Sequence, residues 1–192
     1  MKMRTAFVAA LLLFLASPRA VAAPSLSEAA GSYVIVPSQS VLAFAVPAVS
    51  GPGIKGRFAR FEGTVDIPAD SVEAARVTIT IYPESVTTGQ KRVDDFLKTD
   101  AVFDTRNERA IIFRSARVHR TGEDAATIEG NLTARGRTFR ETFRARLADS
   151  RRGSLRFHVQ GKVFRSRYGM DVGTPIYSNV VDFDMDLSVR RR

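Results

Sequence analysis

The sequence predicts an all-β protein, an eight-stranded antiparallel barrel with a short helical insertion between the third and fourth strands. Apolar and charged residues alternate strictly in several segments, eight segments have strand character, and in one stretch the apolar spacing changes to that of a helix. A two-residue alternation is typical of strands with one buried face. Eight antiparallel strands can close into a barrel without free edges.

The clearest strand lies between residues 180 and 189. Its odd positions are apolar and its even positions are acidic or hydroxylated, with Val181, Phe183, Met185, Leu187 and Val189 alternating with Asp182, Asp184, Asp186 and Ser188. A helix with about 3.6 residues per turn would distribute the aspartates around its axis. The pattern therefore predicts a strand with one apolar and one acidic face.

The N-terminus has the features of a secretory signal. Lys2 and Arg4 precede an apolar run over residues 6–16, and small residues at 20–22 suit a signal peptidase. The run is short for the roughly 20 residues that span a bilayer. The sequence therefore predicts a signal peptide at 1–22, a flexible leader at 23–31 and a single barrel domain at 32–192.

Composition limits how the exported chain is stabilised and what it binds. The sequence contains no cysteine and has a formal net charge of +9. Without disulfides the domain must be stable through burial alone. A modest basic excess is compatible with nucleic acid or anionic lipid and does not by itself choose between them.

The remaining strands follow from alternation and from turn residues. The first is interrupted at Pro37, and the second has a bulge because Phe58 and Phe61 fall on opposite faces. A loop at 47–56 contains Gly51, Pro52 and Gly53. The predicted strands are 33–46, 58–67, 76–82, 110–118, 126–134, 138–147, 155–163 and 180–189.

The predicted helix spans residues 90–98. Val93, Phe96 and Leu97 occupy positions i, i+3 and i+4, the spacing of a helix with one buried stripe. It follows the third strand and so lies at one end of the barrel.

The apolar faces of the strands predict a common interior, large enough in an eight-stranded barrel for side chains or one small ligand. Periodicity does not distinguish a filled interior from a hollow one. The predicted interior residues are Phe44, Phe58, Ile79, Ile81, Phe113, Phe143, Phe157, Phe183 and Met185.

Short motifs along nearly the whole mature chain resemble those of the YceI-like family of lipocalin-like, polyisoprenoid-binding proteins. They are Tyr33-Val34-Ile35, Ser40-Val41, Phe44, Gly56-Arg57-Phe58, Phe61-Glu62-Gly63, Asp94-Asp95-Phe96-Leu97-Lys98, Phe103-Asp104, Ile112-Phe113-Arg114-Ser115, the segment 130–136, Arg165 and Tyr168-Gly169-Met170. The chain departs from the family pattern at Ala48, where a histidine is common, and at 107–109, where a Tyr-Pro pair is frequent.

The resemblance implies a periplasmic, lipocalin-like barrel, closed off by a helix, that holds a long isoprenoid or similar lipid tail in its interior. It implies non-enzymatic binding, sequestration or transport of that lipid, without a cofactor. Transient contact with a membrane or a membrane partner is compatible with this function. The sequence does not indicate an oligomeric state.

One end of the barrel is expected to be rich in basic residues. The loops after strands one, three, five and seven share this end, and arginine offers bidentate hydrogen bonds to phosphate or carboxylate. Arg165, Arg167 and Arg135 are therefore the predicted contacts of an anionic head group, with Arg165 and Arg167 closest to the Tyr168 motif. The alternative is that these arginines lie in ordinary solvated loops and contact no ligand.

No metal or catalytic site is predicted. The three aspartates at 182–186 are spaced along one strand face and are too dispersed for one ion, and cross-strand pairing with Arg156, His158 and Lys162 is expected instead. His119 and His158, the only histidines, lack cysteine co-ligands and a pocket-facing position.

Three other classes of function remain as alternatives. An outer-membrane or cell-envelope barrel without a carrier role would turn its apolar faces outward, although the chain has no tryptophan for an aromatic girdle. Nucleic-acid binding is not favoured, because the aromatic residues lie on the apolar faces away from the arginines. An exported basic barrel could also bind another anionic ligand.

Overall fold

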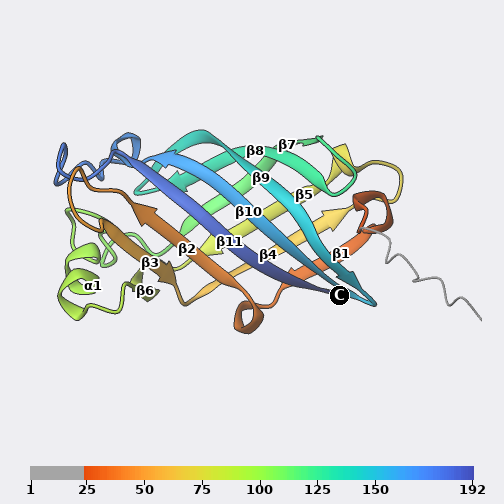
Figure 1. The fold of residues 1–192 in the computed structure, drawn as a ribbon, viewed down its shortest axis with the longest axis horizontal. Helices are drawn as coiled ribbons and strands as arrows, with labels where there is room; N and C mark the ends of the chain where they lie inside the picture. The colour runs from red at the N-terminus through yellow and green to blue at the C-terminus, as the bar shows by residue number, and fades with distance from the viewer. Residues whose placement is uncertain (1–23) are drawn as a thin grey trace, which may run out of the picture.

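The computed structural model describes residues 24–192, which form a closed antiparallel barrel of eight strands (Figure 1). The predicted signal peptide at 1–22 lies outside the described residues. The strands run around the barrel in the order β1-β4-β5-β7-β8-β9-β10-β11, and β11 pairs with β1 to close it. The predicted fold class is confirmed.

The three N-terminal strands of the barrel are each divided into two segments, giving eleven labelled strands. The segments are β1 (Gly31–Ile35) with β2 (Val41–Val46), β3 (Ile54–Phe58) with β4 (Phe61–Ile67), and β5 (Arg76–Ile81) with β6 (Val86–Thr87). The five undivided strands are β7 (Ile111–Arg120), β8 (Ala125–Ala134), β9 (Arg137–Arg151), β10 (Ser154–Phe164) and β11 (Val180–Arg191).

Local breaks divide these strands. A 3-10 turn at Pro37–Gln39 separates β1 from β2, as the interruption at Pro37 predicts, and Ala59 and Arg60 separate β3 from β4, where the bulge is expected. A similar turn at Pro83–Ser85 separates β5 from β6. The sequence interpretation missed β6 and placed the start of β3 inside a loop, because these segments are too short to show a clear alternation.

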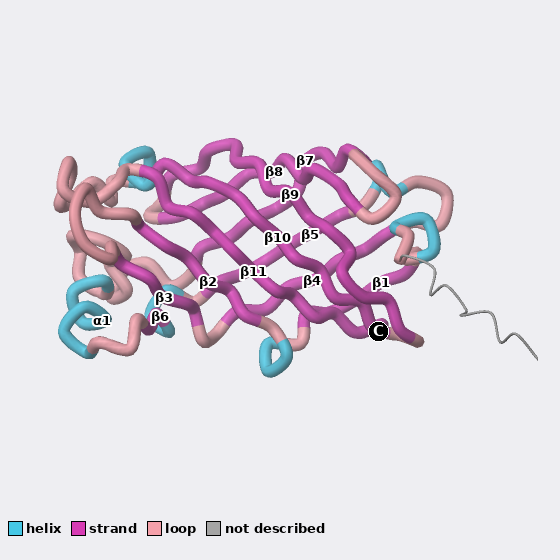
Figure 2. Tube along the Cα trace, viewed as in Figure 1, coloured by secondary structure: helices cyan, strands magenta, loops and turns pink. Residues whose placement is uncertain are grey.

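The long C-terminal strand β11 is the element around which the barrel closes. Its C-terminal part pairs with β1 through Val189, Arg190 and Arg191, and its earlier part pairs with β2 from Asp182 to Asp186. The 3-10 turn at Pro37–Gln39 projects between these two pairings (Figure 2). The Ser40 side chain provides a hydrogen-bond partner for the backbone of β11 there, since Ser188 N donates to Ser40 Oγ over 2.9 Å.

The one α-helix among the described residues, α1 (Lys91–Leu97), lies at one end of the barrel, which we call the α1 end (Figure 1). It confirms the predicted helix. Thr88 fixes its start, because the Thr88 hydroxyl and backbone N–H both donate to Asp94 Oδ1 over 2.6 Å. These hydrogen bonds, with the hydroxyl contributing most, hold the pKa of Asp94 below its ordinary value. Leu97 is buried, whereas Phe96 is 45% exposed.

The opposite end of the barrel is closed by the segment that precedes β1. Leu26 and Ala29 are buried, Leu26 N donates to Glu123 O over 2.8 Å, and the Tyr33 hydroxyl donates to Ala29 O over 3.0 Å. The structure therefore packs part of the segment that was predicted to be a flexible leader against the barrel. Two buried apolar side chains hold this segment against the barrel, a feature too short to show as a periodic pattern.

The two faces of each strand are arranged as the alternation predicts. In β11, Met185, Leu187 and Val189 are buried, and the three aspartates are on the outer face. Lys162 Nζ lies 3.1 Å from Asp182 and His158 Nδ1 lies 3.2 Å from Asp186, which confirms these two cross-strand pairs. Arg156 lies opposite Ser188 and has no ion pair with the aspartates among the described residues.

The apolar faces therefore meet inside the barrel, opposite to the arrangement that an outer-membrane barrel requires. Among the described residues, no helix has the length and apolar composition needed to cross a membrane.

Candidate ligand-binding site

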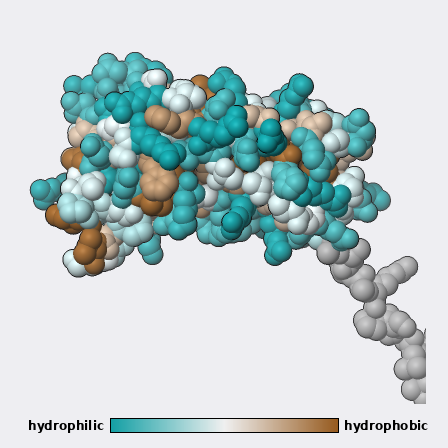
Figure 3. Space-filling model, turned by 90° about the horizontal axis from the view of Figure 1, so that it is seen from above, coloured by the Kyte–Doolittle hydropathy of each residue, from teal (hydrophilic) through white to brown (hydrophobic). Residues whose placement is uncertain are grey.

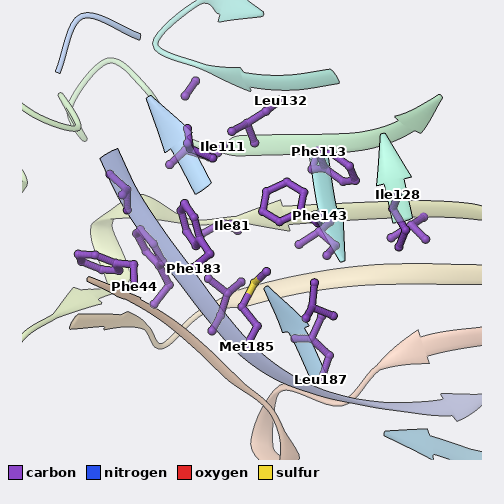
Figure 4. Close-up of a pocket in the computed structure, with 18 of the residues that line it drawn as sticks. Phe44, Ile81, Ile111, Phe113, Ile128, Leu132, Phe143, Phe183, Met185 and Leu187 are labelled. Atoms are coloured by element: carbon purple, nitrogen blue, oxygen red, sulfur yellow. The ribbon is translucent and has the colours of Figure 1, made fainter. Parts of the chain in front are cut away.

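A cavity of about 300 Å³ lies inside the barrel (Figure 4). Side chains from strands all around the barrel line it, and nearly all of them are aliphatic, methionine or phenylalanine. The exceptions are Arg165, Gly173, Tyr168 and Tyr177. Its volume is at the lower end of the range for small-molecule sites, and the barrel is hollow rather than filled.

All nine predicted interior residues line this cavity. Figure 4 shows Phe44, Phe113, Phe143, Phe183 and Met185 gathered around it. The phenylalanine rings pack edge to face on the wall, with ring centroids 5.1 Å apart for Phe113 and Phe143 and 6.2 Å apart for Phe143 and Phe183. The placement of these side chains is therefore as expected, and their contact with a ligand stays a prediction.

Three strand glycines keep the phenylalanine rings against the wall. An added Cβ at Gly56 would lie 2.7 Å from Phe44 Cζ, one at Gly130 would lie 2.7 Å from Phe113 Cε2, and one at Gly161 would lie 2.7 Å from Phe143 Cε1. Each ring thus occupies the space that a side chain on the neighbouring strand would fill. The glycines make room for the rings within the wall and leave the centre of the barrel open.

Small residues contribute further space. Ala75, Ala126, Ala134 and Ala145 all line the cavity. The sequence prediction selected large apolar residues for the interior and missed these alanines. The alternation in their strands nevertheless places Ala145, and also Gly161, on the inward face.

Both ends of the cavity are lined by elements outside the barrel strands. At the α1 end, the helix, the segment that follows it and the loop before β11 contribute Phe96, Leu97, Val102, Phe103, Met170, Val172 and Tyr177. At the other end, Leu26 and Val72 line the cavity. Because Phe96 and Val172 are 45% and 39% exposed, the α1 end is where the lining reaches the surface.

Arg165 has a structural role that the sequence did not predict. Its guanidinium is buried, and all five of its N–H groups donate within its own loop. The acceptors are the backbone oxygens of Met170, Val172 at 2.9 Å, Tyr177 at 3.2 Å and Ser178 at 2.8 Å, and the Thr174 hydroxyl at 3.1 Å.

No N–H group of Arg165 is therefore left for a ligand head group, and the structure does not support that predicted role. Instead, this side chain holds the loop between β10 and β11 in shape over the cavity. The sequence could not predict this role, because a long flexible side chain next to a family motif can turn either toward a ligand or into its own loop.

Arg135 and Arg167 also lie at the α1 end, but they do not line the cavity. Arg135 Nη1 donates to Val102 O over 3.1 Å and to Gly169 O over 2.8 Å, which ties together the two loops that cover this end. The exposed Arg167 lies over the Phe164 ring, 5.0 Å from its centroid. The structure thus brings the three predicted arginines to one end without placing them around one point.

A buried polar pair lies at the cavity wall. The Tyr168 hydroxyl donates to Glu141 Oε1 over 2.9 Å, and Arg167 Nη1 lies 3.8 Å from the same oxygen. Burial first, and then this hydrogen bond, raise the pKa of Tyr168 above its ordinary value. Glu141 has the same parity as the inward-facing Phe143, Ala145 and Leu147 of β9, and this is the one signal in the sequence that could have identified it.

The described residues show no grouping of catalytic or metal-binding side chains around the cavity. Within residues 24–192, His, Asp and Glu form no group of three or more that could hold a metal ion. His119 and His158 are both on the outer face of the barrel, and none of the described histidine or carboxylate side chains lines the cavity.

Comparison with known proteins identifies similar chains. The family model described as the YceI-like domain matches residues 33–190. A UPF0312 protein of Staphylococcus epidermidis is 24% identical over 124 residues, which are 62% of this chain and 70% of that protein.

Solved structures have the same barrel fold. BcnA of Burkholderia cenocepacia superposes with a TM-score of 0.74 at 20% identity, covering 80% of this chain and 98% of that chain. A polyisoprenoid binding domain from Saccharophagus degradans, implicated in plant cell wall breakdown, superposes with a TM-score of 0.67 at 17% identity, covering 83% and 98%. At these identities the likeness establishes the fold alone.

Proposed function

Because the chain belongs to the YceI-like domain family, we propose that it is a non-enzymatic lipid-binding protein that holds the tail of an isoprenoid or similar long-chain amphiphile inside the barrel. It would sequester or transport this lipid. The signal-like N-terminus supports export to the periplasm as part of the same proposal.

The observation that carries the proposal is the apolar character of the cavity wall. Of the polar side chains on that wall, the Arg165 guanidinium donates to its own loop and the Tyr168 hydroxyl donates to Glu141. The third, Tyr177, is half-buried at the α1 end. Such a site has little to offer a polar ligand, because an unpaired polar group in an apolar site is unfavourable. An apolar tail gains roughly 0.8 kcal/mol for each methylene group that it buries.

The head group of such a ligand would stay at the α1 end, where the cavity lining reaches the surface. Arg135 and Arg167 are the remaining predicted contacts for an anionic head. The tail would supply most of the affinity and the head group would set the orientation. The structural similarity to a polyisoprenoid binding domain supports an isoprenoid as the first ligand to test.

The test is binding of prenyl chains of increasing length to delipidated protein. We expect Ile79→Trp, which adds a large side chain to the cavity wall, to abolish binding of long prenols and to spare short ones. Thr80→Trp is the matched control, because Thr80 is the adjacent residue on the opposite face of β5. Equal binding of long prenols by both variants would show that the tail does not occupy the barrel.

A further inference from the structure

Four exposed apolar side chains lie in the helix and the loops at the α1 end of the barrel, and we call them the apolar rim. They are Val49, which is 84% exposed, Ile176 at 63%, Phe96 at 45% and Val172 at 39%. Figure 3 shows several strongly hydrophobic residues at the left end of the molecule, which is the α1 end. Isolated exposed apolar residues are common, but a group around the mouth of a cavity indicates a contact surface.

Backbone contacts hold part of the rim together. Val49 N donates to Ile176 O over 2.9 Å, and Ser178 N donates to Pro47 O over 2.8 Å, so that the loop after β2 lies beside the loop before β11. Phe96 and Val172 belong to the rim and also line the cavity. The rim is therefore the outward continuation of the apolar cavity wall.

The positive charge of the described chain is concentrated at the same end. The segments 47–57, 88–110, 134–140 and 162–182 hold thirteen Lys and Arg residues against seven Asp and Glu, whereas the rest of residues 24–192 holds thirteen of each. Lys91 and Arg92, at the start of α1, are both exposed. The α1 end is thus both apolar and positively charged, and the remainder of the barrel has no net charge.

We propose that the apolar rim docks on the surface of an anionic lipid bilayer. Shallow insertion of apolar side chains combined with attraction of basic residues to anionic lipid is the chemistry of peripheral membrane binding. Docked in this way, the mouth of the cavity faces the bilayer, and an amphiphile can pass between the two without crossing water. This transfer step rests on the proposed function, whereas docking itself does not.

A second copy of the chain fits this surface less well. A symmetric dimer through the rim would place the same positively charged end of each copy against the other, and like charges in close contact are unfavourable. An anionic bilayer is complementary to both the apolar and the basic features.

The test is flotation of the mature chain, residues 23–192, with vesicles; the described part of this chain forms the complete barrel. We expect binding to vesicles that contain phosphatidylglycerol, weak binding to pure phosphatidylcholine, and release as the salt concentration rises. The double variant Val49→Ser and Ile176→Ser should weaken binding by about tenfold. Neither residue lines the cavity, so binding of a prenol in solution should be unchanged.

Two matched controls separate docking from general effects. Val41→Ser removes a side chain that is 45% exposed on the side wall and should leave vesicle binding unchanged. Lys91→Glu with Arg92→Glu should weaken binding at low salt by about tenfold or more. Arg151→Glu with Arg152→Glu makes the same charge change at the opposite end and should have less than a twofold effect.

Failure to bind anionic vesicles, or an equal loss in the control variants, would overturn the docking proposal. So would concentration-dependent dimerisation that the rim variants abolish, because it would assign the rim to a second copy. If the wild-type protein does not bind prenols in solution, the proposed function is instead contradicted. The two failures are therefore distinguishable.

Discussion

Gly161→Ala should narrow the cavity from within its wall. An added Cβ would lie within 2.7 Å of Phe143 Cε1 and closer still to Cδ1, whereas non-bonded carbon atoms prefer about 3.5–4.0 Å. The Phe143 ring must therefore move by roughly 1 Å. The strand behind it blocks movement outward, so the ring moves into the cavity.

The change should affect both stability and ligand affinity. Overpacking typically costs about 1–3 kcal/mol, and the lower entropy of the unfolded alanine variant offsets about 0.4–1 kcal/mol. The net loss of about 0.5–2 kcal/mol in the free energy of unfolding should lower Tm by a few degrees. Losing room for one or two methylene groups, at about 0.8 kcal/mol each, should weaken binding of a long prenol by about 4- to 15-fold.

The assay is thermal unfolding together with prenol titration, and the chain offers two controls. Gly122→Ala adds a Cβ whose nearest neighbour would be 3.6 Å away, so Tm and affinity should remain close to those of the wild type. Adding Phe143→Leu to Gly161→Ala removes the ring and should recover part of the affinity. Wild-type Tm and affinity in the single variant would refute the argument that this glycine keeps the ring out of the cavity.

Three further predictions concern the loops and the barrel wall. Arg165→Ala should lower the free energy of unfolding by about 3 kcal/mol in urea titrations, because it leaves buried acceptors unpaired. Arg167→Ala, at an exposed position, should change it by less than about 0.5 kcal/mol, and similar losses in the two variants would contradict the structural role of Arg165. Phe183→Asp should cost about 3 kcal/mol or more or prevent folding, and Asp184→Ser should be nearly neutral; a reversal would show that the strand faces are inverted. Asp94→Asn should be destabilising at neutral pH, because the lowered pKa of Asp94 stabilises the fold only while the carboxyl is ionised. The difference in stability between wild type and variant should therefore shrink as the pH falls below about 4, and a difference independent of pH would contradict this role of the Asp94 carboxylate.

The alternation of residues in the sequence was sufficient to predict the barrel. In β11 the period of two determines which side chains face inward, and the partners of Asp182 and Asp186 follow from the order of the last two strands. The helix at residues 91–97 also follows from spacing alone. These features could be predicted because each depends on a periodic pattern within one segment.

The features that the sequence did not predict depend on contacts between distant segments. Whether the interior is hollow depends on where the Phe143 ring lies relative to Gly161, and periodicity gives the face of a residue but not the direction of its ring. The same limit applies to Arg165, whose acceptors lie up to 13 residues further along the chain. Leu26 and Ala29 show that two apolar residues can order a segment without any repeating pattern.

Native mass spectrometry of the mature protein, purified without detergent, tests whether the barrel holds a lipid. We expect a complex with one long-chain amphiphile that organic solvent removes, and identification of the extracted molecule would establish the head group. The delipidated protein should have a lower Tm, and adding the extracted lipid should restore it, since a ligand that binds only the folded state stabilises that state. If the protein carries no lipid, and its Tm does not change when prenols or the extracted lipid fraction are added, lipid binding inside the barrel is contradicted.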